Sequence, residues 1–580
     1  MKVTQDPISL YELLTKYQRL TVPRYQREYS WDNEQFSDLF NDILNADEES
    51  GHFFGSLLLY CENNYKMFAD IIDGQQRITT FFLLLNAIKN YLIDYRTRKK
   101  VDIKNQQWIE NSLTKINSCI FVVPTKLTDL NQVQIPRLVT GKRDNKLFIE
   151  ILKGKDHKNV IDKTILSHQL ILKASQSYFI NSLREIDIEK NVVPIVNYLD
   201  KLFESKFIVM TAEKNADKVL LFKTLNARGL ELAQSDLIKN EICKAVPENN
   251  IDDAIDTWDE IKTIIEKANG NIDTFLFHYL NSNNSSKKLR KEIEKKRGNK
   301  GKIKYSPIVP QKYVFEVFEL LLKSSRNVFE LLNEIKSQSE IYIDFISPKQ
   351  KDKAYFNLVG LKALNITKCY PVLLAGKSVL NEKDFVKLAN AIEVISFKHS
   401  ILKEDPKELE ILYYKILDKI YFTKDIKDSI DIIKDHSTNK RQKDFNDYFV
   451  KVSPKPITSK YILFRITRKY QESIEWGSKD IHLEHVMPKK PTGEWLRLKK
   501  QDVDKYDEYL NRVGNLTLLQ DKLNQSASNK EFKTKKRNYY TKSRLYVTNM
   551  TFKKYSSWGY LQIVQRQKDL LKLVNNIWKL

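Results

Sequence analysis

The chain has 580 residues, too many for one hydrophobic core, so its length predicts two to four domains. Hydrophobic residues make up 42% and charged residues 29%, and these proportions exclude wholesale disorder. The net charge is +23, which is typical of proteins that bind a polyanion such as nucleic acid. A lysine-rich proteome would produce the same excess, so charge alone does not decide between the two interpretations.

The four cysteines stand singly in the sequence, without a CxxC pair. This spacing excludes a zinc ribbon and a disulfide framework, and it fits a reducing compartment. The first residues contain no apolar signal core, and no apolar run reaches about 18 residues. We therefore expect a cytoplasmic, soluble protein without a membrane partner.

The N-terminal part mixes strands and helices. Two short apolar runs at 54–60 and 66–72, joined by a polar turn, predict a hairpin. A helix is expected from Ile78 to Leu92. Another strand is expected at about 203–210, followed by a helix that ends at Gly229.

After this helix, Ser235 and Asp236 are expected to cap a new one. The segment 281–304 holds ten Lys and Arg against two Glu. It is either a solvated loop or a strap onto a phosphate backbone. From Val314 to about Tyr470 the pattern is almost purely helical, which predicts a helical spacer.

The segment 71–80, which reads IIDGQQRITT, predicts a strand, a tight turn and a helix start. Gly74 would let a bound group approach the backbone, Arg77 offers a bidentate phosphate clamp, and the helix start offers free N–H groups. The segment therefore predicts a phosphate cradle, although not a Walker A loop. A capped turn with a surface arginine fits the spacing equally well. The candidate residues of the cradle are Asp73, Gly74, Gln75, Gln76, Arg77 and Thr79.

A second set of chemical groups lies near the C-terminus. The segment 481–488 reads IHLEHVMP, 511–519 reads NRVGNLTLL, and Asn524 follows. Phosphodiester hydrolysis needs a base that works near neutral pH, which suits His485. It also needs a divalent cation on hard oxygen ligands, which Glu484 and Asn524 supply.

The geometry of an extended chain restricts how these groups converge. Neighbouring residues such as Glu484 and His485 point to opposite faces of a strand, so both serve one site only at a strand end or bend. Pro488 fits such a bend. The run NLTLL would return as the second strand of a hairpin, and Asn524 would open the following helix.

This arrangement resembles the ββα-metal nuclease fold, also called HNH or His-Me finger. The resemblance implies that His485 is the general base, that Glu484 and Asn524 bind Mg²⁺ or Mn²⁺, and that Asn515 braces the catalytic hairpin. His482 is expected to contact the phosphate or metal. An inert scaffold that keeps these residues is the alternative.

A basic and aromatic run, KEFKTKKRNYYTKSR at 530–544, follows the expected nuclease site. It would either contact a DNA backbone or form a solvated helix face. The candidate DNA contacts in it are Lys530, Lys533, Lys535, Lys536 and Arg537.

Four N-terminal segments occur in an order that resembles the N-terminal domain of GmrSD-type restriction systems: VPRYQREYSW (22–31), FFGS (53–56), DGQQR (73–77) and FKTLNARGLEL (222–232). The resemblance implies a ParB/sulfiredoxin-like α/β fold that binds or hydrolyses a nucleoside triphosphate such as GTP or ATP. An ordinary helix end at Gly229 and core aromatics near Trp31 would also explain the first and last segments. The implied nucleotide contacts outside the cradle are Tyr25, Gln26, Arg27, Asn226 and Arg228.

The family pairs this domain with a C-terminal His-Me finger nuclease. We therefore expect a multidomain α+β protein, predominantly helical, with a ParB/sulfiredoxin-like domain (1–245), a helical spacer (246–455) and a ββα-metal nuclease (456–580). The resemblance implies an NTP-regulated, metal-dependent endonuclease of a phage-defence restriction system that cuts modified DNA, and a homodimer would supply two cutting sites. The alternative is an NTP-dependent DNA-binding or regulatory protein with an inactive nuclease domain.

Overall fold

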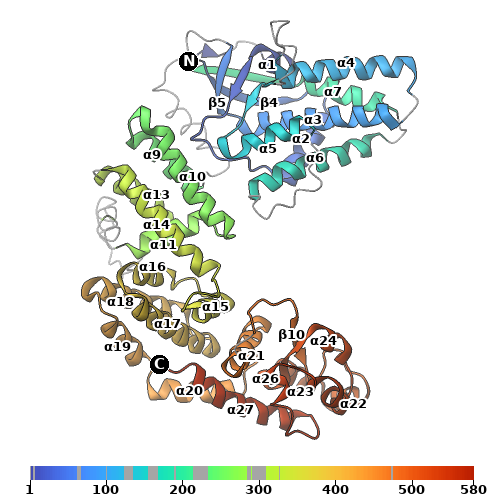
Figure 1. Cartoon of the computed structure of the whole chain (residues 1–580). Helices are drawn as coiled ribbons and strands as arrows, with labels where there is room; N and C mark the ends of the chain where they lie inside the picture. The colour runs from blue at the N-terminus through green and yellow to red at the C-terminus, as the bar shows by residue number, and fades with distance from the viewer. Residues whose placement is uncertain are drawn as a thin grey trace. The chain divides into compact units, whose positions relative to one another are not determined.

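The computed structural model divides into two compact units, Met1–Lys267 and Ala268–Leu580 (Figure 1). The first unit thus extends past the boundary predicted at residue 245. The second unit contains both the predicted spacer and the predicted nuclease. The structure describes residues 2–3, 7–61, 67–98, 101–122, 135–154, 167–187, 191–212, 233–283, 289, 309–325, 327–471 and 474–580.

A mixed β-sheet forms one layer of the first unit. Its described strands run in the order β1-β9-β4-β5-β3-β8, and β2 also pairs with β9. The strands β4 and β5 form the predicted antiparallel hairpin, whereas β9 is parallel to β4, and β3 is parallel to β5 and β8. The bounds are β1 (Lys2–Val3), β2 (Ile8–Ser9), β3 (Arg19–Thr21), β4 (Phe53–Tyr60), β5 (Phe68–Asp73), β8 (Leu138–Val139) and β9 (Lys206–Ala212), with a separate pair β6 (Phe121–Val122) and β7 (Ile135–Pro136).

Helices cover one face of this sheet. Leu57, Leu59 and Ile71 point into the same core as the helices, because alternate residues of a strand face one side. The central helix α3 packs against α4 and α6, and Figure 1 shows these helices beside the sheet. The bounds are α1 (Leu10–Lys16), α2 (Asn33–Leu44), α3 (Gln75–Arg98), α4 (Ile103–Ile120), α5 (Lys142–Leu152), α6 (Ser167–Ile186) and α7 (Val193–Glu204).

Several local predictions for this unit need correction. The strand expected at 203–210 begins only at Lys206, because α7 continues to Glu204. Ser235 and Asp236 do not cap a helix, since α9 begins at Gln234 and buries both residues in its first turn. The helix expected to end at Gly229 lies outside the described residues. The unit ends with α9 (Gln234–Ala245), the short turn η2 (Glu248–Asn250) and α10 (Ile251–Lys267).

The described residues from Val314 to Tyr470 are almost purely helical, as predicted, and this helical part of the second unit shares one core with the C-terminal part. Residues of α15, α17, α20 and α21 pack with the strands β10 and β11 and with the last helix α27. Most of the basic segment 281–304 lies outside the described residues. The bounds are α11 (Ile272–Ser282), η3 (Gln311–Tyr313), α13 (Val314–Ser324), α14 (Val328–Ile346), α15 (Tyr355–Ala363), α16 (Tyr370–Val379), α17 (Glu382–Leu402), α18 (Pro406–Thr423), α19 (Ile426–His436), α20 (Asn439–Phe449) and α21 (Pro456–Tyr470).

The C-terminal part carries a two-stranded antiparallel sheet and short helices. The hairpin predicted around residues 481–519 is present, and α24 packs against both of its strands. Among the described helices of the chain, none is both long and apolar enough to cross a membrane. The bounds are β10 (Ile481–His485), α22 (Gly493–Gln501), α23 (Val503–Leu510), η4 (Val513–Asn515), β11 (Leu516–Gln520), α24 (Asp521–Ala527), α25 (Phe532–Lys535), η5 (Lys536–Tyr540), α26 (Tyr546–Asn549) and α27 (Tyr560–Ile577).

Candidate functional site

The predicted nuclease residues begin at the end of β10. Glu484 lies opposite Thr517 and His485 lies opposite Leu516 in the antiparallel ladder. Neighbouring side chains alternate between the two faces of a strand, so Glu484 and His485 face opposite sides of the hairpin. His485 is the last residue of β10, which is the strand-end position that the sequence analysis required.

The carboxylate of Glu484 is buried and already has partners. Its Oε1 accepts a hydrogen bond of 2.7 Å from Nζ of Lys535 and one of 3.3 Å from the hydroxyl of Tyr540. Burial raises the pKa of Glu484, against the opposing effect of the Lys535 ammonium. Both contacts fall on Oε1.

The imidazole of His485 is half-buried and oriented by one amide. Its Nε2 lies 3.1 Å from Oδ1 of Asn511. An amide oxygen only accepts, so this contact places the proton on Nε2 and leaves Nδ1 as the basic nitrogen. Burial lowers the pKa of His485, which favours the neutral ring that a general base needs.

Asn515 lies at the end of η4 and holds the chain that leaves β10. Its Oδ1 accepts the N–H of Met487 at 2.8 Å, and its Nδ2 donates to the carbonyl oxygens of Met487 at 3.0 Å and Leu510 at 2.8 Å. The side chain is fully buried. Asn515 thus holds the chain after β10 in place, and both polar atoms of its amide are already hydrogen-bonded within the protein.

Asn524 lies in the middle of α24 and does not open that helix as predicted, because α24 begins at Asp521. Its Oδ1 is buried, and no residue in the described part of the chain donates a hydrogen bond to it. His482 points toward the same helix, with Nε2 3.2 Å from Oδ1 of Asp521. Among the hydrogen bonds and ion pairs between described side chains, none joins Glu484, His485 and Asn524 to one another.

A metal site here would depend on few protein ligands. Within the described part of the chain, no cluster of three or more His, Cys, Asp and Glu is arranged to hold a metal ion. The unpartnered oxygen of Asn524 fits a hard cation, which takes oxygen ligands. The Oε1 atom of Glu484 fits less well, because an ammonium group already lies beside it.

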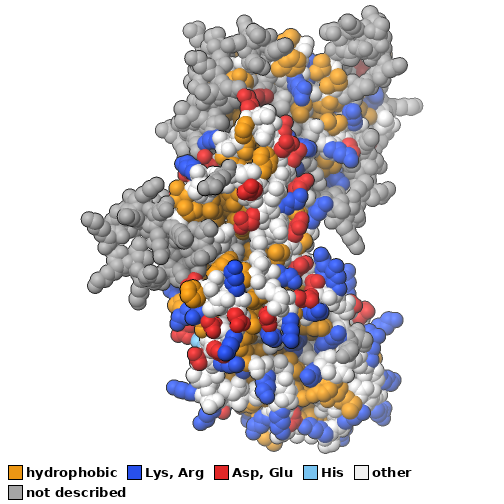
Figure 2. Space-filling model, turned by 60° about the vertical axis from the view of Figure 1, so that its left-hand side comes forward, with side chains coloured by type: hydrophobic (Ala, Val, Ile, Leu, Met, Phe, Trp, Pro, Cys, Tyr) orange, Lys and Arg blue, Asp and Glu red, His pale blue; other side chains and the backbone are white. Residues whose placement is uncertain are grey.

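The predicted DNA contacts have different environments. Lys530, Lys533 and Arg537 are exposed on the surface. Lys536 donates to the carbonyl oxygens of Lys553 and Tyr555. Figure 2 shows Lys and Arg side chains spread over the drawn face of the second unit, with Asp and Glu among them.

Lys535 is the member of this group that does not reach the surface. Its side chain has 0% exposure because it lies inside the C-terminal core beside Glu484. A buried ammonium cannot contact a DNA backbone, so the predicted role of Lys535 needs correction.

In the first unit, the expected phosphate clamp has a structural role. Gly55 has φ +80° and lies within a bulge of β4. Arg77 donates to the carbonyl oxygens of Phe54 and, at 2.7 Å, of Ser56, on either side of that glycine. Its guanidinium also lies 3.5 Å from the carboxylate of Asp73. Arg77 therefore satisfies the backbone of the bulge.

Four other predicted residues line a small pocket. Gln75, Gln76 and Thr79 come from the start of α3, and Arg27 comes from the segment after β3. The cavity volume of the pocket is only about 10 Å³, room for about one water molecule and far below the roughly 300–1,000 Å³ typical of small-molecule sites. A phosphate group of a nucleotide would therefore enter only if the lining side chains moved apart. The remaining lining residues are Val22, Tyr29, Thr140, Gly141, Asp144 and Leu172.

The two residues before Arg27 are not among the residues that line the pocket. Gln26 is buried and donates to the carbonyl oxygens of Ile71 and, at 3.0 Å, of Ile72, so it ties its segment to β5. Burial raises the pKa of the half-buried Tyr25. Asn226 and Arg228 lie outside the described residues.

Asp144 is a buried acid in the pocket wall that was not predicted from the sequence. Asp144 accepts the N–H of Tyr29 at 2.9 Å, and its Oδ1 lies 3.2 Å from Nε2 of His168. Burial raises the pKa of Asp144 to about 7 and lowers the pKa of His168 to about 4. Asp144 follows Gly141 by three residues at a helix start. Because acidic residues are common in the first turn of any helix, this spacing did not mark Asp144 as a site residue.

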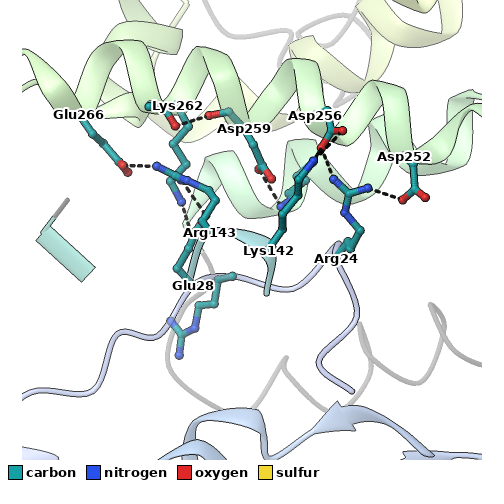
Figure 3. Close-up of polar contacts among 12 residues, drawn as sticks. Arg24, Glu28, Lys142, Arg143, Asp252, Asp256, Asp259, Lys262 and Glu266 are labelled. Carbon is teal, nitrogen blue, oxygen red and sulfur yellow. Dashed lines mark hydrogen bonds and ion pairs between the residues drawn. The ribbon is translucent and has the colours of Figure 1, made fainter. Parts of the chain in front are cut away.

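A network of ion pairs joins the pocket region to α10 (Figure 3). Glu28 pairs with Arg143 at 2.7 Å and with Lys262 of α10, and Arg143 also pairs with Glu266 of α10. Burial acts to raise the pKa of Glu28, but Lys262 and Arg143 outweigh it and lower the pKa. Glu28 and Arg143 each adjoin a pocket residue in sequence.

A second part of the network is more exposed. Arg24 pairs with Asp252 and Asp256 of α10, and Lys142 pairs with Asp256 at 2.8 Å. These contacts explain why α10 belongs to the first unit rather than to the predicted spacer.

Comparisons with known proteins identify the family of the chain. A search of curated proteins found no match. Residues 10–243 match the family model described as the N-terminal domain of the GmrSD restriction endonuclease, and residues 433–573 match the model of the C-terminal domain of GmrSD restriction endonucleases. The two models cover both candidate sites, in the order expected from the sequence. The chain belongs to the GmrSD restriction endonuclease family.

Proposed function

We propose that the chain is a metal-dependent DNA endonuclease whose general base is His485. The supporting observation is the contact between Nε2 of His485 and Asn511, which leaves Nδ1 available at the end of β10. In this mechanism Nδ1 accepts the proton of the attacking water as its oxygen bonds to phosphorus, the bond between phosphorus and the leaving sugar oxygen breaks, and that oxygen takes a proton from solvent. The low pKa of His485 favours the neutral base at physiological pH.

Asn524 and the second carboxylate oxygen of Glu484 would hold the divalent cation, Mg²⁺ or Mn²⁺. When bound, such a cation stabilises negative charge on the phosphate and on the leaving oxygen. His482, held by Asp521, would orient the phosphate from the same side of the hairpin as Glu484. The exposed side chains of Lys530, Lys533 and Arg537 would contact the DNA backbone.

The first unit would regulate cutting by binding a nucleoside triphosphate such as GTP or ATP. The support is the pocket that contains Arg27, Gln75 and Thr79, and that borders the N-terminus of α5 at Gly141. A phosphate group at this helix start would accept hydrogen bonds from free backbone N–H groups and would be attracted by the positive charge of Arg27. The ion pairs of Glu28 and Arg143 connect the pocket to α10. A nucleotide would regulate the enzyme only if it bound one arrangement of this network more tightly than another.

The target would be modified phage DNA, and a homodimer would place one site on each strand. The experiment compares the wild-type protein with His485→Ala on modified phage DNA and unmodified plasmid, with Mg²⁺ or Mn²⁺ and with or without each NTP. We expect the variant to lose at least about 100-fold in cleavage rate. His436→Ala, which changes a half-buried histidine of α19, is the matched control and should cleave normally.

Equal cleavage by wild-type protein and His485→Ala would refute the assignment of the base. A wild-type protein that binds DNA but cuts none of the substrates would support the alternative, a nucleotide-dependent DNA-binding protein with an inactive nuclease domain. Equal cutting of modified and unmodified DNA would refute the preference for modified DNA.

A further inference from the structure

Lys535 is a fully buried lysine whose three hydrogen bonds converge on the end of β10. Its Nζ donates to Oε1 of Glu484 at 2.7 Å, to the carbonyl oxygen of His485 at 2.9 Å and to that of Val486 at 3.1 Å. An ammonium has three N–H donors, so these acceptors satisfy all of them. Burying a charge in this way is costly unless it is paired and hydrogen-bonded, and Lys535 meets both conditions.

The two carbonyl contacts of Lys535 lie on consecutive residues, where the chain leaves the strand. Asn515 holds the next residue, because its side chain bonds both the N–H and the carbonyl oxygen of Met487. The backbone of Asn515 also accepts the N–H of Val486 at 3.0 Å. The backbone from His485 to Met487 is therefore held by a lysine and an asparagine that come from different elements.

We propose that Lys535 is a positioning residue that sets the orientation of His485 by holding the carbonyl oxygens of His485 and Val486, with Glu484 as its buried counter-ion. The inference rests on the proposed role of His485 as the base. The side chain of a residue follows its backbone, so loss of these two contacts would turn the imidazole away from its contact with Asn511. A displacement of about 1 Å in a catalytic group costs on the order of 100-fold in rate.

The test uses the full-length chain with Lys535→Met, which keeps the length of the side chain and removes its donors. We expect kcat to fall by about 100-fold with KM for DNA unchanged, and the loss should persist when the Mn²⁺ concentration is raised. Lys554→Met is the matched control, because Lys554 pairs with Asp569 at the surface and should leave cleavage unchanged. A second readout is the imidazole ¹⁵N signal of His485, identified by its absence from His485→Ala, in protein without metal.

The signal of His485 should shift in Lys535→Met and stay in place in Lys554→Met. Tyr540→Phe removes the other donor to Glu484 but neither carbonyl contact, so we expect less than about a threefold loss of kcat. If Lys535→Met loses its folding transition, Lys535→Met/Glu484→Gln, which removes both charges of the pair, replaces it in the NMR measurement. A displaced His485 signal in that variant supports the proposal, and an unmoved signal overturns it.

Other outcomes overturn the proposal in recognisable ways. Full recovery of Lys535→Met at high Mn²⁺ would show that the lysine acts through the metal site. A raised KM with normal kcat would show that it contributes to DNA binding. A wild-type protein that cuts no DNA, or an active His485→Ala variant, would refute the proposed function itself. Normal cleavage and an unmoved signal in Lys535→Met, beside an inactive His485→Ala variant, would refute only the role of Lys535.

Discussion

Arg77 donates a hydrogen bond of 2.7 Å to the carbonyl oxygen of Ser56, beside the positive-φ residue Gly55 of β4. Through this contact Arg77 stabilises the sheet, whereas Arg27 lines the pocket. Arg27 and Arg77, two of the three arginines predicted for the nucleotide site, should therefore respond differently to substitution.

We expect Arg27→Met to weaken binding of a nucleoside triphosphate by about 10- to 100-fold, because a charge-assisted hydrogen bond contributes roughly 1.5–3 kcal/mol. Stability should change little. Arg77→Met should lower the free energy of unfolding by about 2 kcal/mol or more, because it removes the side-chain donor from two carbonyl oxygens of the bulge. Isothermal titration calorimetry and urea unfolding measure the two effects, and a destabilised Arg27→Met variant would contradict this assignment.

Gly74 should not tolerate a side chain. Its φ is +96°, and an added Cβ would lie 2.1 Å from Cδ2 of Leu57. We expect Gly74→Ala to destabilise the chain by about 2–4 kcal/mol, from left-handed strain and overpacking together. Gly477 also has positive φ, +83°, but open space around it, so Gly477→Ala should cost only about 1–2 kcal/mol. Equal losses of unfolding free energy in the two variants would show that the contact with Leu57 does not matter.

The buried part of the α10 network should contribute more stability than its exposed part. The side chains of Glu28 and Arg143 are 11% and 9% exposed, whereas that of Asp252 is 74% exposed. We expect Glu28→Gln to cost roughly 3 kcal/mol, because it leaves buried cations without their counter-ion. Asp252→Asn should cost less than about 1 kcal/mol, because water and salt screen a surface pair. Chemical unfolding of both variants at low and high salt checks this, and a larger loss for Asp252→Asn would be inconsistent with it.

The effects of Asp144 and His168 on the pH dependence of stability should cancel in the wild-type protein. Between about pH 4 and 6.5 the folded pair holds one proton on Asp144, whose pKa is about 7, and the unfolded pair holds one on His168. The proton counts are equal, so this pair contributes no change in stability across that range.

Asp144→Asn should expose the contribution of His168. The folded pKa of His168 is depressed to about 4, so its unfolded form binds more protons below pH 6.5, and stability is lost as the pH falls. Relative to wild type, we expect the variant to lose roughly 2 kcal/mol between pH 7 and pH 5. His168→Gln should show the opposite sign, because the raised pKa of Asp144 then makes stability fall as the pH rises toward 7. Unfolding curves at several pH values that run parallel to wild type in both variants would refute the pairing.

Local patterns in the sequence predicted the strands whose formation depends mainly on residues adjacent in the chain. Two short apolar runs joined by a polar turn predicted the β4–β5 hairpin, and the GNLTLL run predicted β11, because a short run of apolar residues is typical of a buried strand. Helix starts were harder to predict. Ser235 and Asn524 both looked like initiating residues, yet each lies inside a helix, since the actual start depends on what the first turn packs against.

The chemical types in the two sites were determined by the sequence alone: a histidine with oxygen ligands near one end, and a glycine turn with amides and arginines near the other. Only the tertiary structure decided which of these groups remain available. It buried Lys535 against Glu484 and placed Arg77 on the β4 bulge, and it brought Asp144 to His168 and Glu28 to α10. The physical reason is that the partner of a charged group is chosen by desolvation and distance between segments far apart in the chain, which residue spacing does not encode.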